Sequence, residues 1–317
     1  MALLSSSFAT SSAESGHSQR LKTIALMALA TLCFALLDST AKYLVTEKAI
    51  PVAQVTWLRF AGHVVFSAVA LWPFALTPSL RSAKPLIQIV RSVLMIVTTG
   101  LNFIALRYLQ LDQNITIFFL TPLLVAALAG PLLAEWVGWH RVLAIVAGFI
   151  GVLVVMHPGI GTVHWAMLLV LVAAIGYSLY NIATRYLAAF DPASVTQAYT
   201  PLAGATILAP FALAAWQWPD DWWLWVIFAS LGFWGGLGHW LLILAHRSAP
   251  VPVLAPYIYL GLIWMSVAGY FLFDDIPTLW TLGGGAIVIL SGLYLLARER
   301  RTLGATKGGP ASDIASQ

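Results

Sequence analysis

Charged residues are scarce in this chain. Only 9% of its 317 residues are Asp, Glu, Lys or Arg, whereas 60% are apolar. Soluble domains carry about a quarter charged residues, because a water-facing surface needs them. The shortage excludes a soluble globular domain and predicts a protein whose outer surface faces lipid. The net charge of +4 does not indicate a nucleic-acid partner, since the basic residues are scattered between apolar runs.

Cysteine and catalytic motifs are also missing. Cys33 is the only cysteine, which excludes an intramolecular disulfide and a cysteine-based metal cluster. The sequence contains no His-Glu-x-x-His zinc motif, no Gly-x-Ser-x-Gly nucleophile turn and no Walker phosphate loop. We therefore expect no enzyme activity, no metal site, no cofactor and no ATP-driven pumping by this chain alone.

Long apolar runs fill most of the chain. Each is close to the roughly 20 residues that cross a bilayer as a helix, and unpaired strands are not tolerated in lipid. The fold class expected is an all-α membrane protein with about ten transmembrane helices. The expected spans are residues 23–44, 53–73, 86–106, 112–133, 139–156, 165–187, 194–216, 223–244, 251–273 and 279–297.

The basic residues between the spans predict the orientation. With the N-terminus inside, most Lys and Arg residues fall on the cytoplasmic side, and the pairs Asp220–Asp221 and Asp274–Asp275 fall on the opposite side. This asymmetry places both termini in the cytoplasm. Residues 1–22 and 298–317 are rich in small and polar residues, so we expect disordered cytoplasmic tails there.

The chain also contains an internal repeat. Lys42-Tyr43-Leu44 matches Arg185-Tyr186-Leu187, and Glu135 matches Asp275, at one shift of about 140 residues. The repeats expected are residues 23–157 and 163–297. Five spans per repeat is an odd number, so the second copy is inverted, and inverted repeats place a binding site at their interface near the bilayer midplane.

Several stretches carry a family resemblance: residues 36–44, Trp57-Leu58-Arg59-Phe60, 105–109, 118–123, 135–139 and 148–152. From residue 23 to residue 297 the chain resembles the EamA-type branch of the drug/metabolite transporter superfamily. The resemblance implies a ten-helix, multi-pass carrier of small organic solutes in a bacterial inner membrane. Relatives in this family are associated with amino acids, nucleobases or nucleosides, S-adenosylmethionine and riboflavin. The family gives a mechanism class and no ligand.

Polar residues within the spans are the candidate site, because an ionisable group in a bilayer costs about 2.5–3.5 kcal/mol and usually faces the helix bundle. At about 1.5 Å per residue, Asp38 and Arg59 both lie about 9 Å from the outer face. Asn102 and Asn114 fall at a similar depth. Asp38 and Arg59 would form an outer gate or hold an ionic substrate group. The alternative for Asp38 is a local pair with Lys42, four residues later, with Lys42 reaching outward.

A second, neutral cluster falls toward the inner face. It consists of Tyr180, Asn181, Gln197, Tyr199 and His239. His239 and Asp38 are candidates for coupling transport to protons, although an isolated His is more often a packing residue.

Aromatic residues and prolines within the spans suggest stacking and bending. Tyr257, with Tyr180, could stack a flat substrate or simply pack between helices. Pro122 and Pro256 permit bends in their helices, and Gly232 with Gly236 has a spacing that allows close helix packing.

The function expected is a secondary transporter that moves a small organic metabolite by alternating access. Its partners are the small-molecule substrate and the lipid bilayer, with protons as a candidate coupling ion and no nucleic acid. One chain holds both repeats, so a monomer suffices and a homodimer is equally open. The alternatives are a broad-specificity exporter of drugs or toxic compounds, and a non-transporting membrane scaffold.

Overall fold

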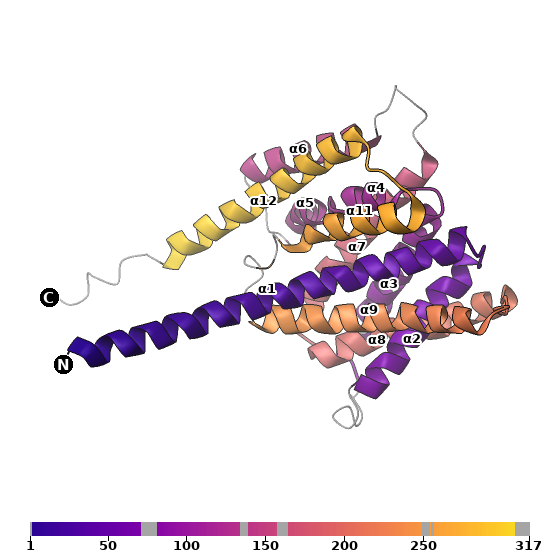
Figure 1. The fold of residues 1–317 in the computed structure, drawn as a ribbon, viewed down its shortest axis with the longest axis horizontal. Helices are drawn as coiled ribbons and strands as arrows, with labels where there is room; N and C mark the ends of the chain where they lie inside the picture. Colours follow the sequence, from indigo (N-terminus) through magenta and orange to yellow (C-terminus); the bar gives the residue numbers. More distant parts are fainter. Residues whose placement is uncertain are drawn as a thin grey trace.

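A computed structural model describes residues 2–70, 81–133, 139–156, 164–248, 254 and 257–307, and all regular structure within these residues is α-helical (Figure 1). The all-α prediction is confirmed. The first half contains α1 (Ala2–Thr46), α2 (Val52–Ala70), α3 (Pro85–Leu106), α4 (Leu111–Phe118), α5 (Thr121–Leu133) and α6 (Trp139–Met156). The second half contains α7 (Trp165–Leu187), α8 (Ala193–Ala214), α9 (Trp222–Ser248), α11 (Leu260–Phe273) and α12 (Leu279–Lys307).

The two terminal helices are longer than the apolar runs predict. Helix α1 begins at Ala2, within the predicted tail, and α12 continues to Lys307, beyond the predicted end at residue 297. The extension of α12 contains Ala297, Arg298 and Arg300, which are strong helix formers, whereas the Ser-rich beginning of α1 has no such local explanation. The start of α1 and the end of α12 lie at the same end of the bundle (Figure 1).

The distribution of residues is that of a protein in lipid. Among the described residues, six segments are long and apolar enough to span a membrane, one of which joins α4 to the first part of α5, and three shorter apolar helices lie in α6, α11 and α12. Large apolar side chains such as Phe271, which is 76% exposed, cover the outside, while polar residues such as Gln54 are completely buried. The chain is therefore a multi-pass membrane protein, and the count of ten spans stays a prediction.

The fourth predicted span is interrupted. Residues 112–133 form two helices, α4 and α5, with a turn at Phe119 and Leu120 just before Pro122. Proline has no N–H and its ring collides with the carbonyl four residues earlier, which explains a break at this point. In the second half, Tyr259 occupies a turn directly before α11. Pro256 lies outside the described residues.

The two interrupted helices meet at their breaks. The rings of Phe119 and Tyr259 are 5.0 Å apart in an edge-to-face arrangement. The phenol of Tyr259 also lies against Gly292 on α12, where a Cβ atom would come within 1.8 Å of its oxygen. The breaks are thus packed against each other and against the last helix.

Helices of the two halves interlock. Helix α1 packs on α9 and α3 packs on α7, and likewise α2 packs on both α9 and α8. Helix α1 also contacts α11, and α7 correspondingly contacts α5. The contact of α2 with α9 corresponds to that of α8 with α3. Each contact has a counterpart when first-half helices are exchanged for their second-half equivalents, as two related repeats require.

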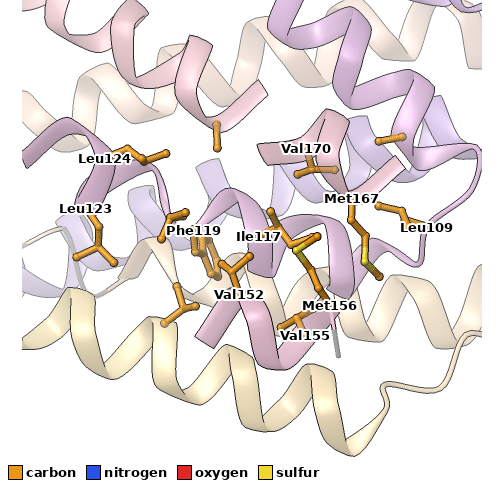
Figure 2. Close-up of a cluster of buried hydrophobic side chains, with 14 of the residues drawn as sticks. Leu109, Ile117, Phe119, Leu123, Leu124, Val152, Val155, Met156, Met167 and Val170 are labelled. Atoms are coloured by element: carbon orange, nitrogen blue, oxygen red, sulfur yellow. The ribbon is translucent and has the colours of Figure 1, made fainter. Parts of the chain in front are cut away.

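An apolar core holds the interrupted helix in place. Figure 2 shows Ile117, Phe119 and Leu123 against Val152 of α6 and Val170 of α7. Helices α11 and α12 complete this cluster. It anchors α4 and α5 from several sides, so their polar faces are held toward the opposite side of the bundle.

Glycines permit the closest approach between helices. A Cβ atom on Gly232 of α9 would lie 2.2 Å from the Cα of Gly62 on α2, and one on Gly236 would lie 2.4 Å from the ring of Phe66. The prediction that Gly232 and Gly236 serve helix packing within the chain is confirmed. This contact brings the polar residues of α2 and α9 close together.

Candidate functional site

Four polar residues predicted near the outer face come together in the structure. Asn102 Nδ2 on α3 donates to Asp38 Oδ1 on α1 at 3.3 Å, and Asn114 Nδ2 on α4 donates to Asn102 Oδ1 at 2.8 Å. Arg59 on α2 donates from Nη1 to Thr99 Oγ1 at 3.0 Å. Thr99 and Asn102 are three residues apart on α3, so one helix face supplies partners for both ionisable residues.

Arg59 also reaches the residues predicted near the inner face. It is 8% exposed, and its charge interacts with the Asp38 carboxylate and with the phenols of Tyr177 and Tyr180 on α7. It interacts with His239 on α9 as well. The two predicted clusters are therefore joined through one long side chain.

Two stacked aromatic pairs complete this region. The rings of Tyr177 and Tyr180 lie 5.6 Å apart with planes 13° from parallel. Those of His63 and His239 lie 5.5 Å apart at 14°. Asn181 Nδ2 donates to the Tyr177 carbonyl at 2.7 Å, within the same turn of α7.

The sequence analysis missed His63 and Tyr177. Each is three or four residues from a predicted site residue, the spacing that puts two side chains on one helix face, and that spacing could have found them. We call the following set the central polar cluster: Asp38, Arg59, His63, Asn102, Asn114, Tyr177, Tyr180 and His239.

Arg91 on α3 is a further buried cation that the sequence analysis missed. Its guanidinium donates to Thr184 Oγ1 at 3.1 Å, to Thr200 Oγ1 at 2.8 Å and to the Thr196 carbonyl. The guanidinium carbon lies 4.7 Å from the centre of the Tyr180 ring. Arg91 thus adjoins the central polar cluster from the α8 side.

A carboxylate closes the turn between α7 and α8. Asp191 accepts from Ser82 Oγ, from Gln88 Nε2 at 2.8 Å and from the Ala83 amide at 2.8 Å. These hydrogen bonds, that from Ser82 above all, hold the pKa of Asp191 below its usual range. The turn is thereby tied to the start of α3.

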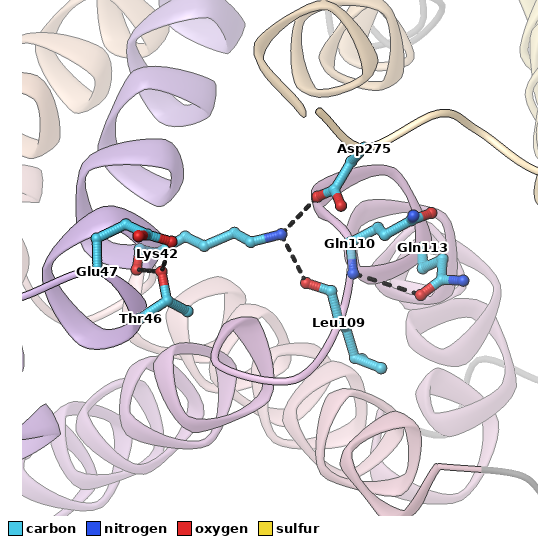
Figure 3. Close-up of polar contacts among 7 residues, drawn as sticks. All are labelled: Lys42, Thr46, Glu47, Leu109, Gln110, Gln113 and Asp275. Atoms are coloured by element: carbon cyan, nitrogen blue, oxygen red, sulfur yellow. Dashed lines mark hydrogen bonds and ion pairs between the residues drawn. The ribbon is translucent and has the colours of Figure 1, made fainter. Parts of the chain in front are cut away.

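An ion pair joins the two halves at the face where α1 ends (Figure 3). Lys42 Nζ donates to Asp275 Oδ2 at 2.6 Å and to the Leu109 carbonyl at 3.1 Å. It also lies 4.6 Å from the Phe273 ring centre. The alternative that Lys42 reaches outward beside Asp38 is wrong, because Lys42 is buried and its ammonium group points at the loop between α11 and α12.

Three further predicted site residues lie on α8 or directly before α11. Gln197 is exposed on α8, and Tyr199 is half-buried on the same helix. Tyr257 packs against an apolar cluster that includes Met27 and Leu254. Within the described residues, no three His, Cys, Asp or Glu side chains are grouped as they would be around a metal ion.

Comparisons with known proteins agree with this architecture. The chain is 26% identical to the S-adenosylmethionine uptake transporter of Rickettsia prowazekii, over 84% of this chain and 89% of that protein. It is 27% identical to the riboflavin transporter of Vibrio cholerae, over 87% of this chain and 93% of that protein. A solved crystal structure with 18% identity has a TM-score of 0.61 and covers 90% of this chain and 99% of its own, which supports the fold.

The named relatives are transporters of small metabolites and not enzymes, in agreement with the prediction that this chain is a metabolite transporter and no enzyme. The EamA-like transporter family matches twice, at residues 21–157 and at residues 164–298. These two matches cover most of the sequence and place one family unit in each half. The chain belongs to the EamA-like transporter family.

Proposed function

We propose that the protein is a secondary transporter that moves a small metabolite with a flat heteroaromatic ring across a bacterial inner membrane by alternating access. The observation that carries the proposal is the central polar cluster, which both halves of a transporter-family chain build within the bundle. The relatives named for S-adenosylmethionine and riboflavin both handle solutes with flat ring systems, which narrows the class of solute.

The cluster has the chemistry that such a solute requires. Tyr177 and Tyr180 stack on each other and are both half-buried, and they supply aromatic surface against which a heteroaromatic ring can pack. Asp38, Asn102 and Arg59 supply acceptors and donors for its polar edge. Burying these groups in lipid without a ligand role costs several kcal/mol, so residues of this kind usually mark a transport path.

Alternating access would exploit the interlocked halves. The ion pair between Lys42 and Asp275 ties α1 to the second half at one face, and its rupture would loosen that face. The contact of Phe119 with Tyr259 places two helix breaks side by side near the core, where bending is easiest. Movement of one half against the other about these breaks would expose the cluster to each side in turn.

Three further features belong to the proposal. Asp38 and the stacked pair His63–His239 are the candidate proton carriers, because they are the titratable groups of the central polar cluster beside its arginine and tyrosines. The basic loops support a cytoplasmic location for both termini. A monomer is sufficient, since both repeats are in one chain.

Uptake of labelled riboflavin and labelled S-adenosylmethionine by cells tests the proposal. Wild type is compared with Arg59→Gln and with the exposed-site control Gln197→Ala, at matched membrane levels. Saturable uptake of either solute by wild type and Gln197→Ala, with at least about tenfold less by Arg59→Gln, is the expected result.

Two results would contradict the proposal. Equal uptake by all three proteins and by cells without them would remove the transport function for this solute class. Efflux of many unrelated lipophilic cations, with no saturable metabolite uptake, would favour the broad exporter instead.

A further inference from the structure

Arg91 is a buried cation whose hydrogen bonds go to neutral groups. It is 2% exposed, and its guanidinium donates to two threonine hydroxyls and one backbone carbonyl. Its Nε atom is buried and has no partner among the described residues. Five donors in a fixed fork suit a planar anion, so this guanidinium is only partly used.

The nearby carboxylates are occupied elsewhere. Asp38 interacts with Arg59, and Asp191 accepts from Ser82, Ala83 and Gln88. Among the described residues, the central polar cluster and Arg91 together therefore hold two arginines and one carboxylate, that of Asp38. A buried charge without a counter-ion is strongly unfavourable in a bilayer, and such residues are retained where a function requires them.

We propose that Arg91, with Thr184 and Thr200, binds an anionic group of the transported solute, a carboxylate or a phosphate. The inference rests on the proposed function and adds the charge of the solute to it. Tyr180 lies between the two arginines: its ring contacts the Arg91 guanidinium and its phenol interacts with Arg59. A ring packed against Tyr177 and Tyr180 would have Arg91 close to its substituents, because the guanidinium lies 4.7 Å from the Tyr180 ring centre.

Arg91 and Arg59 lie near opposite faces of the membrane-spanning bundle. It is six residues from the start of α3 at Pro85, so about 9 Å from the face opposite to that of Arg59. A solute moving between the faces would pass from one cation to the other. Arg91 interacts with His239 as well, which places it on the same interior as the rest of the cluster.

A structural role for Arg91 makes the opposite prediction about stability. If Arg91 chiefly ties α3 to α7 and α8, its replacement by Gln destabilises the protein. If it is an uncompensated cation kept for binding, Arg91→Gln unfolds at the same temperature as wild type or higher, because a buried charge has been removed. Under the binding proposal, Arg91→Gln therefore keeps or raises the stability of the ligand-free protein while it weakens binding of the anion. Under a structural role, the same variant lowers the stability.

The test measures thermal unfolding of the purified full-length protein in detergent, with two pairs of probes. Nicotinate is compared with nicotinamide, and riboflavin 5′-phosphate with riboflavin, so that each pair differs in one anionic group. Wild type should bind the anion of at least one pair about tenfold more tightly than its neutral partner. Arg91→Gln should remove that preference and keep the affinity for the neutral probe, while Gln197→Ala keeps both.

Other outcomes overturn the proposal. It fails if neither anion is preferred by wild type, or if Arg91→Gln keeps the preference. If Arg91→Gln unfolds several degrees lower than wild type, the Arg91→Lys variant, which keeps the positive charge, decides the question. The proposal also fails if that variant is folded and shows no preference for the anionic probe. The binding readout is independent of transport: anion preference without uptake in cells would refute the proposed function alone, and uptake without anion preference would refute Arg91 alone.

Discussion

Breaking the ion pair between Lys42 and Asp275 should destabilise the face where α1 ends. The side chains are 9% and 20% exposed, so the pair is mostly out of water. Removal of one partner of a buried pair costs about 3–5 kcal/mol, because the other charge is left uncompensated. Asp275 keeps some contact with water, so we expect a loss of about 3 kcal/mol for Lys42→Met, including its hydrogen bond to the Leu109 carbonyl.

A double-mutant cycle separates the pair from these other contacts. Lys42→Met, Asp275→Leu and the double variant are unfolded reversibly by a denaturing detergent in mixed micelles, followed by tryptophan fluorescence. The double variant should be about 2 kcal/mol more stable than the sum of the single losses predicts, since it leaves no orphaned charge. The cycle of Lys42 with Asp38 is the control and should show a much smaller coupling.

The same variants test whether the pair keeps one face closed. Cys33 is buried and is the only cysteine, so a Cys33→Ser background gives a single reporter when Leu109→Cys is added. Leu109 is buried beneath Lys42, and Lys42→Met should raise its labelling by a membrane-impermeant thiol reagent in intact cells. Coupling near zero, or labelling that does not change, would refute the role assigned to this ion pair.

Two other predictions concern packing and pH. Gly232→Ala should destabilise the protein by about 1–3 kcal/mol, because its Cβ would lie 2.2 Å from the Gly62 Cα and the backbones must separate. The matched control Gly283→Ala has nothing within 4 Å of its Cβ and should be neutral or gain up to about 1 kcal/mol in an unfolding titration. The pKa of Asp191 is lowered by folding, so its stabilisation is present above the unfolded-state pKa of about 4 and is lost as pH falls through the folded-state value. Asp191→Asn should flatten the loss of stability below about pH 4, and a steep acid transition in that variant would contradict the assignment.

The helical architecture could be predicted because lipid imposes it. A run of about 20 apolar residues has few stable alternatives in a bilayer, so the existence of the spans follows from composition. The break in the fourth span followed from Pro122, whose chemistry acts locally. The ends of α1 and α12 did not follow, because outside the membrane the helix is limited only by weak propensities.

The sequence predicted how deep the site residues lie in the membrane better than it predicted the direction in which their side chains point. Counting residues along a helix gives depth at about 1.5 Å each, and Asp38 and Arg59 do find hydrogen-bond partners on the same helix, α3. Which way a side chain points depends on how helices rotate about their axes, and this is set by packing between distant segments. Gln197 therefore proved to be exposed, while His63 and Tyr177, which were not selected, face the cluster.

The partner of a buried charge is the hardest feature to predict from the sequence. Lys42 has an acidic residue one turn away at Asp38, yet it pairs with Asp275, more than 200 residues later. Asp38 instead accepts a hydrogen bond from Asn102 inside the central polar cluster. The long-range pair forms where the fold removes both groups from water, and only the fold determines that place.

The buried charges of this protein divide according to whether the chain itself neutralises them. Lys42 forms an ion pair with Asp275, and Arg59 shares the central polar cluster with the carboxylate of Asp38. Arg91 has hydroxyls, a carbonyl and an aromatic face, which orient a guanidinium but do not cancel its charge. A membrane-embedded fold can tolerate such a residue only if stability is sufficient elsewhere, for example in the glycine contact between α2 and α9. The ion pair of Lys42 with Asp275 therefore describes how the molecule is held together, whereas Arg91 is the uncompensated cation that we propose for binding.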